Sequence, residues 1–246
     1  MLTIKNIIGR FKKRVTTFLL PAIFLFSCAN NKEPDSSDEV DPEAIYFDYQ
    51  VRGEEGNDYI TVLLQFRFGG ENGGTLTLEE PGKVELDGEV IAPDSSKITG
   101  AYYEIQKPIK VFTGRHSIVF TGSDKKIYKN EFDFQPLLLL TTIGDTLRRS
   151  DLVFDPIVIG FNGLNSEDYV RVLLTDTTFT GNGINRLDTV RNGRLLITKQ
   201  ELENIANGPV QLEFIREHER RVKNRMGERG KLQITYSLKR EFILKD

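Results

Sequence analysis

Alternation of apolar and polar side chains is the feature that most limits how this chain can fold. In residues 59–68, YITVLLQFRF, every second position from Ile60 is apolar, and the positions between include threonine, glutamine and arginine. Residues 232–244 repeat the pattern over a longer run. Since successive side chains of a β-strand point to opposite faces, both segments are predicted to be strands with one buried side. The period of an α-helix is scarce after residue 43.

Turn sequences separate further short strands. These strands are expected near 75–79, 83–91, 101–105, 116–121, 127–134, 153–161 and 193–198. Gly-Gly, Asn-Gly and Asp-Gly pairs between many of them favour tight turns. Many short strands joined by turns are typical of β-sandwiches and barrels. One short helix is predicted over 199–206, with Thr198 and Glu201 forming a capping box.

Two ordered echoes indicate an internal repeat. Residues 58–64, DYITVLL, resemble residues 168–174, DYVRVLL, at an offset of 110. A second echo relates 114–120 to 208–214 at an offset of 94. Both offsets are close to the size of one immunoglobulin-like sandwich, about 100 residues.

We therefore predict an all-β fold of two tandem immunoglobulin-like β-sandwiches, 44–136 and 137–246, the second containing the short helix. The boundary is placed near Pro136. The four leucines at 137–140 are then either the first strand of the second sandwich or an interdomain contact. A single larger sandwich is the alternative, because two strands of similar pattern can match by chance.

Residues 1–27 differ in composition from the rest of the chain. They hold five basic and no acidic residues, and a mostly apolar run from Val15 to Phe26 follows the basic part. That run is too short to cross a bilayer comfortably, which takes about 20 residues. A basic start and a short apolar stretch predict a secretory signal peptide. A buried N-terminal helix is the alternative.

The single cysteine follows this segment directly. The sequence Leu25-Phe26-Ser27-Cys28 resembles the bacterial lipobox, with a branched apolar residue at −3 and a small residue at −1. The resemblance implies cleavage before Cys28, lipidation of its thiol, and several acyl chains that anchor the protein in a membrane. Residues 28–43 are polar and mostly acidic and contain two prolines, so they are predicted to be a flexible, disordered tether.

The Lys32-Glu33 pair within this tether is similar to the surface-export signal of Bacteroidota lipoproteins. A plain solvated linker is the alternative. The expected location is therefore the outer membrane, with the protein lipid-anchored and facing the cell exterior.

Composition excludes several kinds of function. The chain has 33 basic and 36 acidic residues, and removing the five basic residues of the signal leaves 28 against 36, a net charge of −8. This charge argues against nucleic-acid binding. One cysteine rules out an intramolecular disulfide and a multi-cysteine metal site. Two histidines are few for a histidine-rich metal site. No metal and no cofactor are expected.

The sequence holds no clear catalytic group. His116 and Ser117 are adjacent on a predicted strand, where neighbours face opposite ways, so they cannot form a base–nucleophile pair. His218 lies in a highly charged stretch. Both histidines are expected to be solvated or at strand edges, and the chain is predicted not to be an enzyme.

Residues 215–231 form the most basic part of the chain, with seven basic against three acidic residues. They are expected to join two strands of the second sandwich as a long hairpin. One hypothesis is that this hairpin binds an anionic partner through Arg216, Arg220, Arg221, Lys223, Arg225 and Arg229. The alternative is a solvated hairpin whose charges discourage edge-to-edge pairing.

Three Asp-Thr pairs, at Thr146, Thr177 and Thr189, resemble the O-glycosylation sequon of Bacteroidota envelope proteins. The resemblance implies modification of these threonines. Ordinary turn chemistry explains the same pairs.

The whole layout looks like a secreted Bacteroidota lipoprotein with tandem immunoglobulin-like domains. We expect a non-enzymatic protein-interaction or accessory subunit of an envelope complex, with a protein partner in the outer membrane. The alternative is a glycan-binding accessory lipoprotein of a polysaccharide-uptake system. That role needs exposed aromatic rings, for which Tyr102-Tyr103 and Tyr46-Phe47-x-Tyr49 are the candidates.

Overall fold

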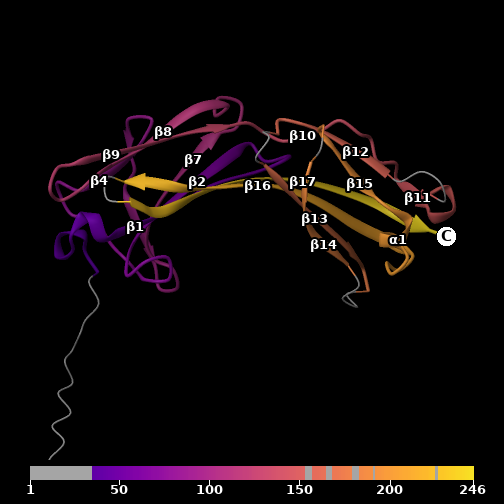
Figure 1. The fold of residues 1–246 in the computed structure, drawn as a ribbon, viewed down its shortest axis with the longest axis horizontal. Helices are drawn as coiled ribbons and strands as arrows, with labels where there is room; N and C mark the ends of the chain where they lie inside the picture. The colour runs from indigo at the N-terminus through magenta and orange to yellow at the C-terminus, as the bar shows by residue number, and fades with distance from the viewer. Residues whose placement is uncertain (1–34, 153–156, 165–167, 179–182, 191, 225–226) are drawn as a thin grey trace, which may run out of the picture. The chain divides into compact units, whose positions relative to one another are not determined.

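The computed structural model describes residues 35–152, 157–164, 168–178, 183–190, 192–224 and 227–246. Within these ranges the chain consists almost entirely of β-strands, with one four-residue α-helix and three short 3-10 helices (Figure 1). The predicted all-β class is confirmed.

The strands of the N-terminal half are β1 Ile45–Glu54, β2 Tyr59–Phe68, β3 Gly74–Thr75, β4 Lys83–Leu86, β5 Glu89–Val90, β6 Pro93–Ser96, β7 Gly100–Pro108, β8 Gly114–Thr121 and β9 Ile127–Phe134. The 3-10 helices η1 Ser37–Glu39 and η2 Pro42–Ala44 precede them. The tether predicted over 28–43 is therefore ordered from residue 35 onward, where Ser37 and Val40 are buried, and residues 28–34 lie outside the described residues. The predictions for 59–68 and 127–134 match β2 and β9 at both ends. The strand β1 was not predicted, although every second residue from Ile45 to Val51 is apolar and buried.

The C-terminal half contains β10 Leu138–Leu139, β11 Thr146–Arg148, η3 Arg149–Leu152, β12 Ile157–Asn162, β13 Tyr169–Asp176, β14 Ile184–Thr189, β15 Arg194–Ile197, α1 Lys199–Leu202, β16 Gly208–Asn224 and β17 Gly227–Lys245. The strand predicted at 153–161 is confirmed from Ile157 onward, and 153–156 lie outside the described residues. The capping box of α1 is confirmed by hydrogen bonds in both directions between Thr198 and Glu201. The helix ends at Leu202, earlier than predicted.

The strands form three sheets. The largest has ten strands in the order β14-β13-β16-β17-β1-β2-β7-β6, with β11 also paired to β17 and β3 to β2. A four-stranded sheet has the order β5-β4-β8-β9, and a three-stranded sheet has the order β10-β12-β15.

Aromatic contacts show that each small sheet packs face to face on the large one. The ring centroids of Phe47 on β1 and Phe66 on β2 lie 5.0 and 4.9 Å from that of Phe120 on β8. In the C-terminal half, the ring of Phe161 on β12 lies 5.1 Å from that of Phe214 on β16. Two sheets with interdigitating side chains between them make a sandwich. The predicted β-sandwich architecture is therefore confirmed.

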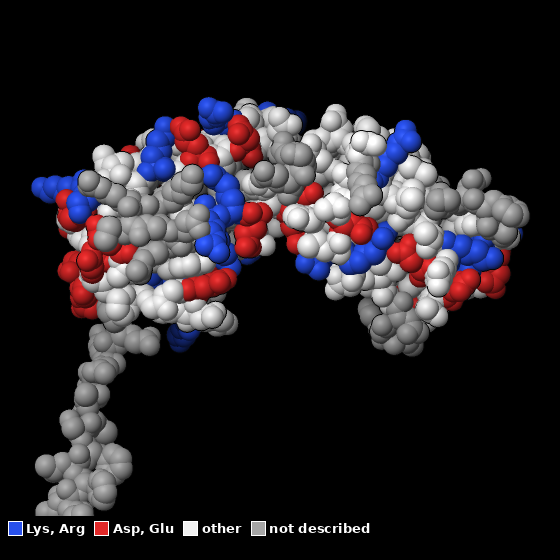
Figure 2. Space-filling model, in the orientation of Figure 1, with Lys and Arg blue, Asp and Glu red and all other residues white. Residues whose placement is uncertain are grey.

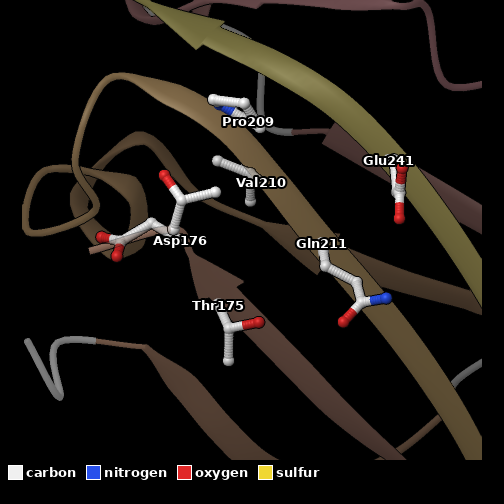
Figure 3. A pocket seen from close by; sticks show the side chains of 7 residues that line it. Thr175, Asp176, Pro209, Val210, Gln211 and Glu241 are labelled. Carbon is white, nitrogen blue, oxygen red and sulfur yellow. The ribbon is translucent and has the colours of Figure 1, made fainter. Parts of the chain in front are cut away.

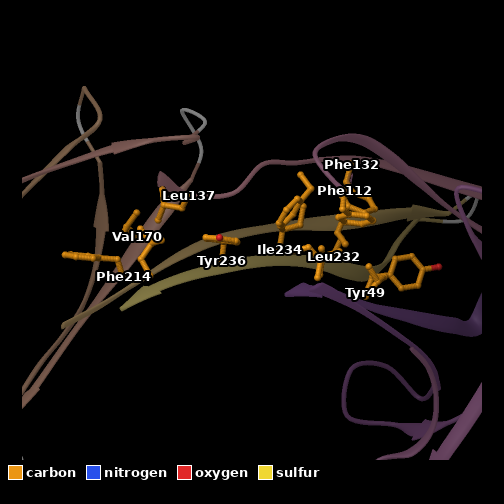
Figure 4. Close-up of a cluster of buried hydrophobic side chains, with 14 of the residues drawn as sticks. Tyr49, Phe112, Phe132, Leu137, Val170, Phe214, Leu232, Ile234 and Tyr236 are labelled. Atoms are coloured by element: carbon orange, nitrogen blue, oxygen red, sulfur yellow. The ribbon is translucent and has the colours of Figure 1, made fainter. Parts of the chain in front are cut away.

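The long strands β16 and β17, of 17 and 19 residues, take part in both sandwiches. In the C-terminal half, Val210–Glu217 of β16 pair with β13. Gly230–Ser237 of β17 instead pair in parallel with Phe47–Glu54 of β1, in the N-terminal half. Figure 4 shows buried side chains of both halves along these strands, including Phe214, Tyr236 and Leu232. The boundary near Pro136 thus divides the sequence but not the large sheet.

A glycine marks the point where β17 enters the N-terminal half. Gly230 pairs with Phe47. A Cβ atom added to Gly230 would clash with the backbone oxygen and nitrogen of Phe47. The close approach of β17 to β1 therefore requires glycine at this position.

Candidate ligand-binding site

A hollow of about 440 Å³ lies on the outward face of the ten-stranded sheet, where β1, β2, β16 and β17 are neighbours. We call it the outer-face groove. Its lining residues are Arg52, Gly53, Glu54, Asn57, Tyr59, Thr61, Glu213, Ile215, Glu217, Thr235 and Ser237. Most of them occupy strand positions next to buried residues such as Val51, Ile60 and Phe214. Because side chains alternate along a strand, the groove residues face away from the sandwich core.

Strand register places groove residues in a row across the sheet. Thr61 pairs with Arg52, Arg52 with Thr235, Thr235 with Glu217, and Glu217 with Tyr169. Four steps of about 4.8 Å between neighbouring strands give this row a length of about 19 Å. Tyr169 does not line the groove itself but extends its row onto β13.

Ion pairs hold the charged side chains of the groove in place. Arg171 donates two hydrogen bonds to Glu217, from Nε at 2.6 Å and from Nη2 at 3.2 Å. This pairing raises the pKa of the Arg171 guanidinium. Lys239 pairs with Glu54, and the hydrogen bond raises the pKa of the Lys239 ammonium. Figure 2 shows basic and acidic side chains next to one another over the face in view, as such pairing requires.

The hydroxyl groups of the groove are not used internally. In the part of the chain that the structure describes, no hydrogen bond engages the side-chain oxygens of Tyr59, Thr61, Thr235 or Ser237. Each hydroxyl can donate one hydrogen bond and accept others. The groove therefore offers fixed charges and free hydroxyls to a ligand.

Two exposed tyrosines lie in and beside the groove. Tyr59 is 54% exposed and Tyr169 is 45% exposed. Neither was a predicted site residue. The sequence held a usable signal, since Tyr59 and Tyr169 are equivalent positions of the first echo and each precedes an inward-facing residue.

The aromatic candidates from the sequence are mostly unsuitable as a binding surface. Phe47, Tyr49 and Tyr103 are buried. Tyr102 lies on β7 and its hydroxyl donates to Asp94 Oδ2 at 3.1 Å.

The basic stretch forms the predicted hairpin between β16 and β17, but the hairpin pairs with the N-terminal half of the large sheet and does not project from a free end of the second sandwich. Backbone pairing with β17 continues along β16 to Asn224, and β17 also pairs with β1. Arg221 is exposed, while Arg220 is half-buried and donates to the backbone oxygen of Glu131 on β9. The side chains of Lys223 and Arg229, and the whole of Arg225, lie outside the described residues. Anion binding by this stretch stays a prediction.

Arg216 has an internal role that the sequence did not reveal. It is 2% exposed, its Nη1 donates to the oxygen of Gly163 at 2.9 Å, and its Nε lies 3.9 Å from Asp168 Oδ2. The guanidinium also lies 5.9 Å from the ring centre of Phe134. Burial lowers the pKa of Arg216, and the charge of Asp168 opposes that shift. Because Arg216 is buried, it cannot contact an anionic partner.

The histidines are both paired with aspartates. His116, expected to be solvated or at an edge, is buried, with Nδ1 2.7 Å from Asp87 Oδ2 and its ring stacked on Phe112. His218 Nδ1 lies 3.0 Å from Asp168 Oδ1. The expectation for His116 is wrong because the loop carrying Asp87 folds back onto β8. Ser117 contacts Asp87 only through its backbone nitrogen and oxygen, so the geometry forms no base–nucleophile pair there.

The three sequon threonines are exposed but differ in setting. Thr146 lies on β11 and Thr189 on β14, whereas Thr177 follows the end of β13. Thr177 borders a second hollow, of about 350 Å³ (Figure 3). There Asp176 Oδ1 accepts a hydrogen bond from the nitrogen of Thr178 at 2.9 Å, which is ordinary turn chemistry. Modification of these threonines stays a prediction.

A second surface feature lies on the three-stranded sheet. Leu137 is buried and β10 follows, so the four leucines begin the second sandwich rather than an interdomain contact. The outward positions of this sheet form the aliphatic patch, which consists of Leu138, Leu140, Val158 and Leu196. These side chains are between 41% and 66% exposed. The oxygen of Gly160 accepts a hydrogen bond from the nitrogen of Leu140 at 2.8 Å. Because glycine has no side chain, the surface of the patch is flat at this position.

Comparisons with known proteins define no family. No family model and no curated protein matches the chain in sequence. Among solved structures, the chain is similar to a complex of Dpr11 IG1 with DIP-gamma, at 10% identity and a TM-score of 0.23, covering 82% of this chain and 98% of the other. Similarity to DIP-gamma IG1+IG2 is at 11% identity and a TM-score of 0.22, covering 82% and 96%.

A third similar structure is SGBP-B of a Bacteroides ovatus mixed-linkage glucan utilization locus, in complex with a mixed-linkage heptasaccharide. The identity is 11% and the TM-score 0.18, covering 78% of this chain and 60% of the other. Likeness at these TM-scores supports no conclusion about ligands. Among the described residues, no helix is long and apolar enough to cross a membrane. In those same ranges no three His, Cys, Asp or Glu side chains are grouped as a metal site.

Proposed function

We propose that this chain is a non-enzymatic binding protein, lipid-anchored in the outer membrane and facing the cell exterior, that serves as an accessory subunit of an envelope complex. The aliphatic patch is the observation that supports a protein partner. Exposed apolar side chains on the outer face of a sheet stabilise a complex when a partner covers them, because their area is then removed from water. The patch therefore fits an apolar surface on another protein of the complex.

Photo-cross-linking tests the patch. A photoreactive residue at Leu140 should give one discrete adduct with an envelope protein in intact cells, and the added change Leu138→Glu should abolish it. Ile98 is the matched control, because it is an equally apolar side chain, 95% exposed, outside the patch. Identical adducts from positions 98 and 140, or none from 140, would contradict the proposal.

The membrane anchor has its own test. The change Cys28→Ser removes the thiol that the lipobox resemblance marks for lipidation. We expect the variant to leave the membrane fraction, because no acyl chains would then hold the chain at the bilayer. Fractionation of cells and metabolic labelling with a fatty acid measure this. Continued membrane partitioning, with cleavage at the same bond, would show that the anchor lies elsewhere.

The second candidate function, a glycan-binding accessory lipoprotein of a polysaccharide-uptake system, is supported by a different surface. Tyr59 stands exposed in the outer-face groove, beside free hydroxyls on β2 and β17. The two functions are compatible in one protein, since the groove and the aliphatic patch lie on different sheets.

A further inference from the structure

We infer that the outer-face groove is a binding site for a neutral carbohydrate chain, laid across β2, β1, β17 and β16 between Tyr59 and Tyr169. The inference names a site and a ligand class for the second candidate function, on which it rests. It does not depend on the aliphatic patch.

The free hydroxyls argue for a ligand rich in hydroxyl groups. Thr61, Thr235 and Ser237 lie on two strands of the groove floor, and their hydroxyl groups have no hydrogen-bond partner within the described residues. A hydroxyl both donates and accepts, so it matches another hydroxyl in either direction. Their short side chains lose little rotational freedom when they bind.

The fixed charges favour a neutral ligand over an anionic one. Arg52 is the one cation among the lining residues, against the carboxylates of Glu54, Glu213 and Glu217. Arg52 itself donates to Gln50. Arg171 and Lys239 beside the groove neutralise Glu217 and Glu54, so a polyanion would find no cluster of unpaired cations there. The paired carboxylates keep lone pairs that can accept hydrogen bonds from sugar hydroxyls.

The position of the groove disfavours an extended peptide. Here β1, β16 and β17 each pair with a strand on both sides, so the groove presents no open edge for backbone pairing. Ile215 is the single aliphatic side chain among the lining residues. Specific peptide recognition needs apolar pockets or an open edge, and the groove provides neither.

The tyrosines supply the apolar contact that hydroxyls lack. Tyr59 and Tyr169 are exposed rings that combine an apolar face with a polar hydroxyl. A rigid ring of this kind gives contact area at low entropic cost. The C–H face of a sugar ring can pack on each of them. The two tyrosines lie on β2 and β13, the strands at the two ends of the row of about 19 Å.

Affinity electrophoresis tests the inference. Full-length protein in detergent is run through gels containing mixed-linkage glucan, xyloglucan, galactomannan or dextran, with polygalacturonate as the anionic comparison. We expect at least one neutral polysaccharide to retard the protein, with little change between low and high salt. Tyr59→Ala and Tyr169→Ala should each weaken the apparent affinity about tenfold. Thr235→Val combined with Ser237→Ala should weaken it as well.

Tyr102→Ala is the matched control, because Tyr102 is on the same face but is bonded to Asp94 on the neighbouring strand β6. It should leave retardation unchanged, and melting curves of all variants should match. Loss of retardation in Tyr102→Ala equal to that in Tyr59→Ala would overturn the inference. So would retardation by polygalacturonate alone, or by no neutral polysaccharide. Each of these results leaves the cross-linking test of the protein partner unaffected, so the two proposals fail separately.

Discussion

A fragment of residues 44–136 should not fold on its own, although it contains all strands from β1 to β9. In the structure, β1 pairs with Gly230–Ser237 of β17, which the fragment lacks. The fragment also lacks three buried side chains of that strand, Leu232, Ile234 and Tyr236. Burial of each is worth about 1.5–3 kcal/mol. Their sum is comparable with the whole stability of a typical domain, about 5–15 kcal/mol.

Urea unfolding followed by circular dichroism measures this. The fragment 44–136 should show no cooperative transition, whereas 44–136 joined by a flexible linker to 216–237 should show one. The linked hairpin restores the partner of β1 and is the matched control. A sigmoidal transition of 44–136 alone would instead support two separately folding sandwiches, which the structure leaves untested.

Arg216→Ala should destabilise the protein by about 3–5 kcal/mol, the cost typical of removing one partner of a buried ion pair. The change leaves the carboxylate of Asp168 with one fewer positive charge in a buried position. It also removes the donor to Gly163 and the cation that lies over Phe134. These contacts connect β16 to the end of β9 and to the residues before β13. A large fall in the free energy of unfolding is therefore expected.

Arg171→Ala is the control for this experiment. Arg171 also pairs with a carboxylate, that of Glu217, but both side chains are partly exposed. Solvent-accessible ion pairs contribute about 0–1 kcal/mol, so this variant should unfold close to the wild type. Urea midpoints at neutral pH compare the three proteins. Equal midpoints for Arg216→Ala and Arg171→Ala would show that the buried cluster adds no more than a surface pair.

Much of the fold follows from local sequence. The strict alternation of residues 59–68 and 127–134 specifies β2 and β9 to the residue, because one face must be buried and a shift by one position would expose it. Thr198 and Glu201 specify the start of α1 through bonds within three residues. The sandwich class follows from many such strands between turns. The echo also contains Tyr59 and Tyr169 of the candidate site, since the parity of each strand shows which tyrosines face outward.

Long-range pairing decided the rest. No local feature of the sequence near Leu232 predicts that β17 pairs with β1, some 180 residues earlier. The pairing of strands depends instead on the burial of side chains over the whole sheet. The same pairing places the predicted basic hairpin beside β1 of the N-terminal half. It also brings Thr61, Thr235 and Glu217 into one row. Arg216 and His116 look like surface residues in the sequence, and their burial depends on Asp168 and Asp87, which only the tertiary structure brings next to them. The sequence by itself therefore determined the strands and the signals for anchoring. Only the tertiary structure decided which strands are neighbours, because that choice depends on contacts between distant segments. The pairing of the strands in turn decided which residues line the groove.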